Sequence, residues 1–111
     1  MHTVLLIEDQ PEIALMLRLA ISRSGHRALL AMNIKEAEQI WAAYRNEITA
    51  IVADNTLPDG SGIQFARRLH DEYAHLRVII TCGLTNALPP EFQRLDKPFT
   101  ISEFKAVLES D

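Results

Sequence analysis

Short apolar runs alternate along the chain with longer stretches in which apolar residues recur every three or four positions. Four of the runs contain few polar residues: Thr3–Ile7, Ala28–Ala31, Ile48–Ala53 and Val78–Thr81. A run of this length without polar alternation is typical of a parallel strand that is buried on both faces. A short segment near Gln93–Asp96 is predicted to form a fifth strand.

The stretches between these runs predict helices, because their apolar residues would all lie on one side of a helix. Helices are expected from Pro11 to near Gly25, after Asn33, from about Gly62 to Tyr73, and after Thr100. Asn33 and Thr100 are each followed by a glutamate three residues later, which is the spacing of a capping box. Asp9 or Gln10 is the predicted cap of the helix that begins at Pro11.

The segment Leu84–Glu91 interrupts this alternation. Its Pro89-Pro90 pair is unsuited to a helix interior, because proline lacks the amide hydrogen and its ring clashes with the preceding turn. The segment is also too short to hold a full connecting helix. We therefore expect the connection before the last strand to lack most or all of its helix.

Strands that alternate with helices predict an α/β domain with a parallel sheet covered on both faces. Right-handed crossovers place the carboxyl ends of all strands at one edge, where ligands bind in such sheets. The polar residues at those ends are Glu8 and Asp9 after the first strand, Asp54 after the third, Thr81 or Cys82 after the fourth, and Lys97 after the fifth. The functional site is predicted at this edge.

The residue types at this edge indicate phosphoryl-transfer chemistry. Glu8, Asp9 and Asp54 would repel one another, and Mg²⁺ is a hard cation that favours carboxylate oxygens. Without a metal, at least one of these groups should have a raised pKa. Lys97 could pair with Asp54 or with a phosphoryl group placed there. A carboxylate can itself act as a nucleophile and form an aspartyl phosphate.

The composition is that of an ordinary globular domain. Of 111 residues, 48% are hydrophobic and 23% are charged, so a single domain over residues 1–111 is expected to fold without a disulfide. The single cysteine, Cys82, fits a reducing compartment. The net charge of −4 argues against nucleic-acid binding. No long apolar run or leader sequence is present, which predicts a cytoplasmic protein without a membrane span.

Three motifs, in this order, resemble the receiver domain of two-component response regulators. They are Leu6-Ile7-Glu8-Asp9-Gln10, Asp54-Asn55-Thr56-Leu57-Pro58-Asp59-Gly60-Ser61-Gly62 and Lys97-Pro98-Phe99, each after a predicted strand. The resemblance covers the chain from Val4 to about Leu108. It implies a flavodoxin-like, doubly wound sheet of five parallel strands in the order 2-1-3-4-5. In this chain the fourth helix of that fold would be short or missing.

The resemblance also implies a role for each residue of the site. Asp54 would accept a phosphoryl group from the phosphohistidine of a histidine kinase or a histidine phosphotransfer protein. The Mg²⁺ ligands would be Asp9 and Asp54 directly, Glu8 through water, and Thr56 through its backbone carbonyl. Lys97 would contact the phosphoryl group, and the peptide bond after this lysine is often cis in the family.

Two departures from the family pattern concern the conformational switch. The hydroxyl-bearing residue that usually ends the fourth strand aligns with Cys82, whose thiol is a weak donor, and Thr81 comes just before it. Because side chains alternate along a strand, Thr81 could take that role only if the strand shifted by one residue. Arg94 stands at the usual aromatic switch position of the fifth strand, so the common threonine–tyrosine coupling cannot operate in its usual form.

Each motif also has a simpler interpretation when it is taken alone. Glu8-Asp9 could cap a helix, Asp54 could be a turn residue, and the lysine-proline motif could form a strand-to-helix corner. Cys82 could be a small buried hydrophobic residue. The four histidines are scattered and are predicted to lie on the surface.

We interpret the chain as a stand-alone receiver, phosphorylated on Asp54 in a Mg²⁺-dependent reaction, that signals through protein–protein contacts. It would assist its own phosphorylation and dephosphorylation, so it is not expected to be a conventional enzyme. Recognition is expected on the first helix or on the face of the fifth strand and last helix, without a nucleic-acid or membrane partner; a homodimer is compatible. Two alternatives are a phosphorylation-independent module, which Cys82 and Arg94 motivate, and a receiver fragment of a larger hybrid protein.

Overall fold

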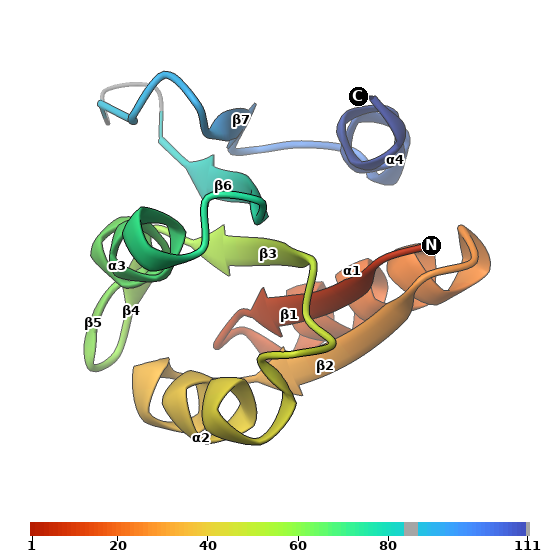
Figure 1. The fold of residues 1–111 in the computed structure, drawn as a ribbon. Coiled ribbons are helices and arrows are strands. Elements are labelled where there is room, and N and C mark those ends of the chain that lie inside the picture. Colours follow the sequence, from red (N-terminus) through yellow and green to blue (C-terminus); the bar gives the residue numbers. More distant parts are fainter. Residues whose placement is uncertain (84–86, 111) are drawn as a thin grey trace.

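A computed structural model describes residues 1–83 and 87–110 of the chain. Figure 1 shows a twisted sheet with helices on both faces. The strands are β1 (Thr3–Ile7), β2 (Arg27–Ala31), β3 (Ala50–Asp54), β4 (Thr56–Leu57), β5 (Gly60–Ser61), β6 (Arg77–Cys82) and β7 (Gln93–Asp96). The helices are α1 (Pro11–Arg23), α2 (Ile34–Tyr44), α3 (Gly62–Glu72) and α4 (Ile101–Glu109). Across the described ranges, no helix is both long enough and apolar enough to cross a membrane.

The main sheet has five strands in the order β2-β1-β3-β6-β7. All four neighbouring pairs are parallel. This confirms the predicted order 2-1-3-4-5, because β4 and β5 form a separate antiparallel hairpin. That hairpin occupies the segment between the third strand and its helix, where no strand was predicted. Because neighbouring strands of the main sheet are parallel, the carboxyl ends of β1, β3, β6 and β7 meet at one edge.

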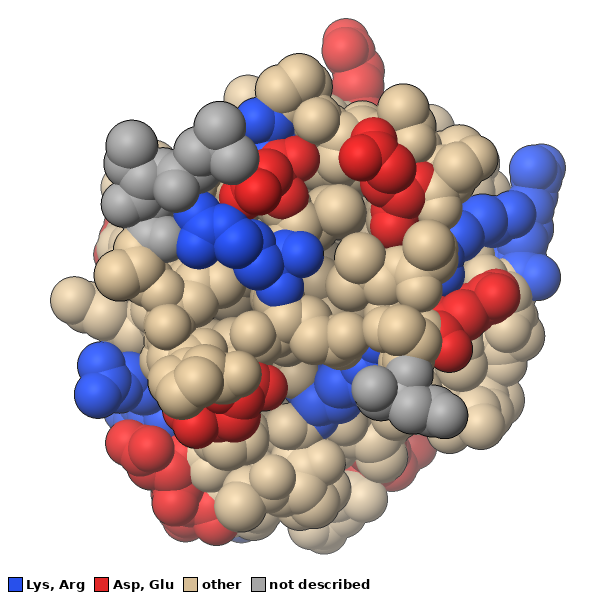
Figure 2. Space-filling view, turned by 90° about the horizontal axis from the view of Figure 1, so that it is seen from above, with Lys and Arg blue, Asp and Glu red and all other residues tan. Residues whose placement is uncertain are grey.

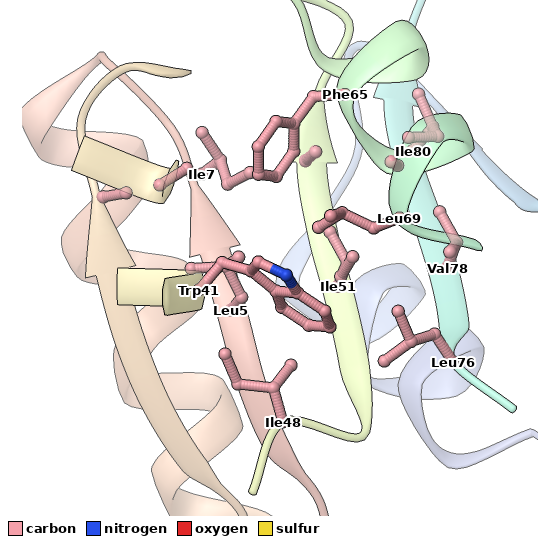
Figure 3. Close-up of a cluster of buried hydrophobic side chains, with 14 of the residues drawn as sticks. Leu5, Ile7, Trp41, Ile48, Ile51, Phe65, Leu69, Leu76, Val78 and Ile80 are labelled. Atoms are coloured by element: carbon pink, nitrogen blue, oxygen red, sulfur yellow. The ribbon is translucent and has the colours of Figure 1, made fainter. Parts of the chain in front are cut away.

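Two hydrophobic cores lie on opposite faces of the sheet. One core joins the strands to α2 and α3, and Figure 3 shows Trp41 and Phe65 from these helices packed over Leu5 and Ile51. The other joins the strands to α1 and α4 and includes Leu6 and Phe104. Because side chains alternate along a strand, the neighbours Leu5 and Leu6 belong to different cores. This explains why the strands are almost continuously apolar.

The helix starts follow the predicted capping signals in part. Thr100 and Glu103 form a complete capping box at α4. At the start of α2, the Asn33 side chain accepts a hydrogen bond from the Glu36 amide. The Glu36 carboxylate, however, accepts a hydrogen bond from the amide of Met32 and not from that of Asn33, so this capping box is incomplete. Gln10 is the N-cap residue of α1 and makes no side-chain capping bond. Proline at the first position of α1 needs no amide partner, which reduces the need for a cap.

The connection from β6 to β7 contains no helix over its described residues 87–92. Residues 84–86 of the predicted interruption lie outside the described residues. Leu88 and Phe92 pack against the core on the α2 and α3 side. Phe92 also makes an edge-on ring contact with His70 of α3, with the ring centres 5.4 Å apart. These side chains contribute apolar cover to a part of the sheet that lacks a helix of its own.

Arg77, at the amino end of β6, joins the sheet to the end of the last helix. Its guanidinium donates hydrogen bonds to the backbone carbonyls of Val107 and Leu108 in α4. Its Nε donates to the Gln93 side chain of β7 at 2.7 Å. Cations stabilise the carbonyl end of a helix, so this arginine acts as a C-terminal cap supplied from a distant strand.

Three of the four histidines, His2, His26 and His70, are partly buried rather than fully on the surface. His2 and His26 lie at the edge of the sheet opposite the predicted site, with ring centres 5.4 Å apart. The His2 amide donates to Nδ1 of His26 at 2.8 Å, and Nδ1 of His2 lies 2.8 Å from the Thr49 hydroxyl. Burial, reinforced by His26, lowers the pKa of His2. The simple surface prediction is therefore incomplete for this pair.

Candidate functional site

The three acidic residues at the ends of β1 and β3 converge. Ile7 and Ala53 are paired in register, so the residues that follow them, Glu8 and Asp54, leave the sheet side by side. One carboxylate oxygen from each of Glu8, Asp9 and Asp54 lies within 4.8 Å of the others. The structure thus brings together the acidic group that was predicted from residues far apart in the sequence.

Glu8 is the most deeply buried of the three acids, with only 1% of its surface exposed. Its Oε2 accepts the Gln10 amide at 3.1 Å, whereas Oε1 has no partner among the described residues. Burial raises the pKa of Glu8, and the charges of Asp54 and Asp9 add to this effect against the lowering by the Gln10 amide. A buried carboxylate oxygen without a partner, beside two more acids, is a donor set that fits Mg²⁺.

Asp54 is held on both of its oxygens. Oδ1 accepts the backbone amide of Thr56 at 3.3 Å, and Oδ2 lies 2.8 Å from Nζ of Lys97. The Asp54 side chain is 6% exposed and that of Lys97 is 33% exposed. The lysine therefore pairs with a largely buried carboxylate, while about a third of its own side chain stays exposed. Thr56 lies two residues after Asp54, and a metal-binding role of its carbonyl stays a prediction.

Lys97 follows directly after β7 and is positioned by the sheet. Its backbone amide donates to the carbonyl of Cys82 at 2.9 Å, which continues the pairing of β6 with β7 beyond the last strand residue. The Lys97–Pro98 peptide bond is cis, as the family resemblance implied. Because β6 lies between β3 and β7, the lysine side chain crosses the end of β6 to reach Asp54.

Gly62 allows the chain after Asp54 to return close to it. A Cβ atom at position 62 would lie 1.9 Å from the backbone oxygen of Asp54, which no side chain can tolerate. The Gly62 amide donates to the carbonyl of Asn55 at 2.9 Å, and Ser61 caps α3 by accepting the Gln64 amide. The glycine thus keeps α3 packed directly against the acidic residue.

Asp59 has a role that the sequence analysis missed. Its two carboxylate oxygens accept the amides of Ile34 and Lys35 at 2.8 and 3.0 Å, so it binds the amino end of α2 from the β4–β5 hairpin. The Ile34 amide lowers the pKa of Asp59. A Pro-Asp-Gly turn signals where the chain reverses, but it carries no information about a partner some 25 residues earlier.

Thr81 and Cys82 point to opposite faces of the sheet. Thr81 is paired in register with Asp54 and is 1% exposed, and its hydroxyl has no partner among the described residues. Cys82 belongs to the core on the α2 and α3 side, where burial raises the pKa of its thiol. The predicted alternation therefore holds, and Thr81 is the residue that shares a register row with Asp54.

Arg94 is engaged at the outer strand of the sheet. Its Nε donates to Oδ1 of Asp96 at 2.6 Å, and one of its terminal nitrogens donates to the carbonyl of Gly83 at 2.6 Å. Arg94 thereby links β7 to the residue that follows β6. Figure 2 shows acidic and basic side chains in small separate groups on the face above β7 and α4, with large uncharged areas between them.

An apolar pocket shares Lys97 with the acidic site. It has a volume of about 380 Å³ and lies between α1 and the segment after β7, lined by Ile13, Met16, Lys97, Pro98 and Phe99. A second hollow between α1 and α4 shares Met16 with it and adds Leu19, which is 46% exposed. Lys97 thus contributes both to the acidic site and to an apolar surface on α1.

The comparison with protein families gives a match over nearly the whole chain. The model of the response regulator receiver domain matches residues 4–109. Among curated proteins, the response regulator GtcR of Aneurinibacillus migulanus is 34% identical over 79 residues, which cover 70% of this chain and 31% of that protein. The aligned part is therefore less than a third of the length of that relative.

Solved structures with the same fold are numerous. The non-phosphorylated HemR receiver domain of Leptospira biflexa has a TM-score of 0.84 at 24% identity, with 98% of this chain and 92% of that chain covered. The response regulator TrrA of Thermotoga maritima, in complex with Mg²⁺ and BeF, has a TM-score of 0.83 at 18% identity, with 98% and 97% covered. At these identities the likeness establishes the shared fold.

Proposed function

The chain belongs to the response regulator receiver family, and from this membership we propose that Asp54 accepts a phosphoryl group from a phosphohistidine of a partner protein. Receiver domains in general receive their signal from histidine kinases or phosphotransfer proteins. The observation that carries the proposal is the environment of Asp54: Nζ of Lys97 lies 2.8 Å from one oxygen, and ligand atoms of Glu8 and Asp9 lie within 4.8 Å.

Glu8, Asp9 and Asp54 would hold Mg²⁺, and the backbone carbonyl of Thr56 is proposed as a further ligand. The metal, when bound, supplies positive charge that stabilises the phosphoryl oxygens during transfer. Two features of the chain support this assignment. Glu8 keeps a buried oxygen without a partner in the described structure, and its pKa is raised by burial and by its acidic neighbours.

In the proposed transfer, a carboxylate oxygen of Asp54 attacks the phosphorus atom of the phosphohistidine. A P–O bond forms, the P–N bond breaks, and its electron pair stays on the imidazole nitrogen of the donor. As negative charge arrives with the phosphoryl group, the Lys97 ammonium moves from the Asp54 carboxylate to a phosphoryl oxygen. Attack of water on the phosphorus later releases inorganic phosphate and restores the carboxylate. The protein assists this cycle without turning over a separate substrate.

The donor is proposed to dock along α1, beside the apolar pocket. Ile13 and Met16 line this pocket together with Lys97, which also pairs with Asp54. A helix of the donor that packs its apolar residues here would carry its histidine to the acidic edge. Output is proposed to follow through contact with a downstream protein.

The proposal is tested by phosphoryl transfer to the purified chain in the presence of Mg²⁺. Acetyl phosphate and a panel of phosphorylated histidine kinases or phosphotransfer proteins serve as donors, and the product is identified by intact mass and by acid–base stability. We expect a single acyl phosphate that is absent from Asp54→Asn. Labelling that persists in this variant would remove Asp54 from the mechanism.

A second candidate is an interaction module that works without phosphorylation. It is favoured by Arg94, which is bound to Asp96 and Gly83 where an aromatic switch residue was expected, and by Cys82, which packs into the core. This candidate predicts that a downstream partner binds equally well with and without beryllofluoride. The first candidate predicts that beryllofluoride changes this affinity.

A further inference from the structure

Asp59 bonds the turn of the β4–β5 hairpin to the start of α2, and we propose that this contact holds the backbone carbonyl of Thr56 in place for Mg²⁺. The inference rests on the metal site of the proposed function and adds a positioning residue to it, because Asp59 would act through Thr56 and not as a ligand. It also makes the start of α2 sensitive to metal binding at the other end of the hairpin.

The hairpin connects Asp59 to Thr56 over a very short distance along the chain. Thr56 and Leu57 of β4 pair with Ser61 and Gly60 of β5, which leaves Asp59 in the connecting turn. Two paired strands of two residues each have little freedom to bend between their ends. A displacement of the turn therefore displaces β4, and with it the carbonyl of Thr56.

The base of the hairpin is fixed to the sheet. The Asn55 amide donates to the carbonyl of Thr81 at 3.0 Å, and the Asn55 carbonyl accepts the Gly62 amide at 2.9 Å. Leu57 is buried in the core on the α2 and α3 side. The side chain of Thr56 is exposed and gives no anchor in that core. The position of Thr56 consequently depends on its strand pairing and on where the turn is held.

Asp59 holds the turn with two hydrogen bonds to a different part of the fold. Its Oδ1 accepts the Ile34 amide at 2.8 Å, and its Oδ2 accepts the Lys35 amide at 3.0 Å. A carboxylate at the start of a helix forms charge-assisted bonds and is also favoured by the helix dipole. The turn packs closely here as well, because a Cβ atom built on Gly60 would lie 3.5 Å from Cγ1 of Ile34.

The start of α2 is arranged so that two of its amides are left for the hairpin. The Asn33 side chain caps α2 by accepting the Glu36 amide. The first amides of a helix that lack a cap can bind water instead. The helix could therefore begin without Asp59, whereas Asp59 ties the turn of the hairpin to the rest of the domain.

This contact couples the metal site to α2. When the hairpin is held, the carbonyl of Thr56 is preorganised beside Asp54, so less free energy is spent in fixing it when a cation binds. Coupling between two sites is reciprocal. Mg²⁺ on the Thr56 carbonyl would therefore favour the state in which Asp59 is bonded to the start of α2.

The first experiment measures the affinity of the purified chain for Mg²⁺ by isothermal titration calorimetry. Asp59→Ala removes both acceptor oxygens, and Asp71→Ala removes an exposed carboxylate of α3 as the charge-matched control. Each measurement is made at low and at high KCl, because salt screens a long-range charge effect and leaves a positioning effect in place.

We expect Asp59→Ala to weaken Mg²⁺ binding about threefold or more, since groups that orient a metal ligand contribute factors of up to about 100 to affinity. The ratio of variant to wild-type affinity should be the same at both salt concentrations. Asp71→Ala should bind Mg²⁺ like the wild type. A merely structural role of Asp59 would lower the melting temperature of Asp59→Ala and leave its Mg²⁺ affinity unchanged.

A second pair of variants breaks the contact from the side of α2 and leaves Asp59 intact. Ile34→Pro removes one donor at the first helical position, where proline is tolerated after the extended Asn33. Ile34→Ala shortens the same side chain and keeps the amide. Mg²⁺ should bind more weakly to Ile34→Pro than to Ile34→Ala.

Hydrogen exchange of single amides, followed by NMR, tests the reciprocal effect. Saturating Mg²⁺ should slow exchange of the Ile34 and Lys35 amides in the wild type by about the factor that Asp59→Ala loses in affinity, and it should not slow them in Asp59→Ala. The Glu103 amide, which is capped by its own helix in α4, is the control and should respond little.

Wild-type Mg²⁺ affinity of Asp59→Ala overturns the inference. So does an equal loss in Asp71→Ala, a loss in Asp59→Ala that vanishes at high salt, equal affinities of Ile34→Pro and Ile34→Ala, or exchange at Ile34 that ignores Mg²⁺. The proposed function fails separately. A wild-type chain that binds no Mg²⁺ refutes the metal site and the inference together, whereas one that binds Mg²⁺ and is never labelled on Asp54 refutes only the phosphoryl transfer.

Discussion

The ammonium of Lys97 lies 2.8 Å from the carboxylate of Asp54, although the two residues belong to strands that are separated by a third. This ion pair connects the residue after β7 to the end of β3, across the end of β6. It places a positive charge beside the acceptor carboxylate. Its removal therefore gives the most direct test of how the site is held together.

Lys97→Met should lower the free energy of unfolding by about 1–2 kcal/mol in a metal-free buffer, since Asp54 is left as a buried charge beside two other acids. Urea unfolding measures this change. Lys105→Met, on the exposed face of α4, is the matched control and should change stability little. Equal stability of Lys97→Met and the wild type would mean that the ion pair contributes nothing to the fold.

Mg²⁺ should stabilise the folded chain, because a ligand that binds only the folded state shifts the unfolding equilibrium. The gain should reach about 2.7 kcal/mol at a concentration one hundred times the dissociation constant. Thermal unfolding with increasing Mg²⁺, followed by addition of a chelator, measures it. Glu8→Gln and Asp9→Asn should reduce the gain, whereas Glu12→Gln, at an exposed position of α1, should retain it.

Gly62→Ala should be severely destabilising, by about 3 kcal/mol or more, because the added Cβ would lie 1.9 Å from the backbone oxygen of Asp54. Ser61→Ala removes the neighbouring helix cap and should cost only about 1 kcal/mol. Urea unfolding distinguishes the two. A Gly62→Ala variant as stable as Ser61→Ala would show that α3 can move away from Asp54 at little cost.

Acidification should destabilise the chain through His2. Burial and the nearby His26 lower the pKa of folded His2 below 6.5, so the unfolded chain binds a proton first as the pH falls. The folded state is favoured fully above pH 6.5, and this contribution is lost between that value and the lower folded pKa. Urea unfolding over this window should show a smaller pH dependence for His2→Gln. Identical slopes for the variant and the wild type would contradict the prediction.

Met16→Ala should separate donor docking from the chemistry at Asp54. Met16 lines both hollows on α1, so its truncation should slow transfer from a phosphorylated donor protein. Labelling by acetyl phosphate needs no docking surface and should be unchanged. Ile40→Ala, which shortens a partly buried side chain of α2 on the other side of the sheet, is the control. Equal slowing with both donors would place the effect at the acceptor itself.

Most of the fold could be predicted because β1, β2, β3 and β6 are largely apolar segments and each helix has one apolar side. The edge that holds Glu8 and Asp54 follows from parallel topology alone, since the residues after β1 and β3 must leave the sheet together. Lys97 was placed there by the same reasoning. Asp54 was one of the two partners considered for this lysine, and the structure shows the ion pair.

Other features depend on three-dimensional contacts that leave no local pattern. The sequence around Asp59 indicates only a turn, and the structure reveals the hydrogen bonds that this residue accepts from the start of α2. His2 and His26 are far apart in the sequence and meet because β1 and β2 pair. The alternation of Thr81 and Cys82 was foreseen, but the side that faces Asp54 depends on the exact register of β6, which a single sequence does not specify.

The guanidinium of Arg77 anchors the carboxyl end of α4 to the sheet. It holds the carbonyls of Val107 and Leu108 from the amino end of β6, the strand whose other end is in register with Asp54. Helix ends usually fray, whereas this one is bonded to an internal strand of the sheet. The final turn of α4 should therefore open less often than the end of a helix that has no such anchor.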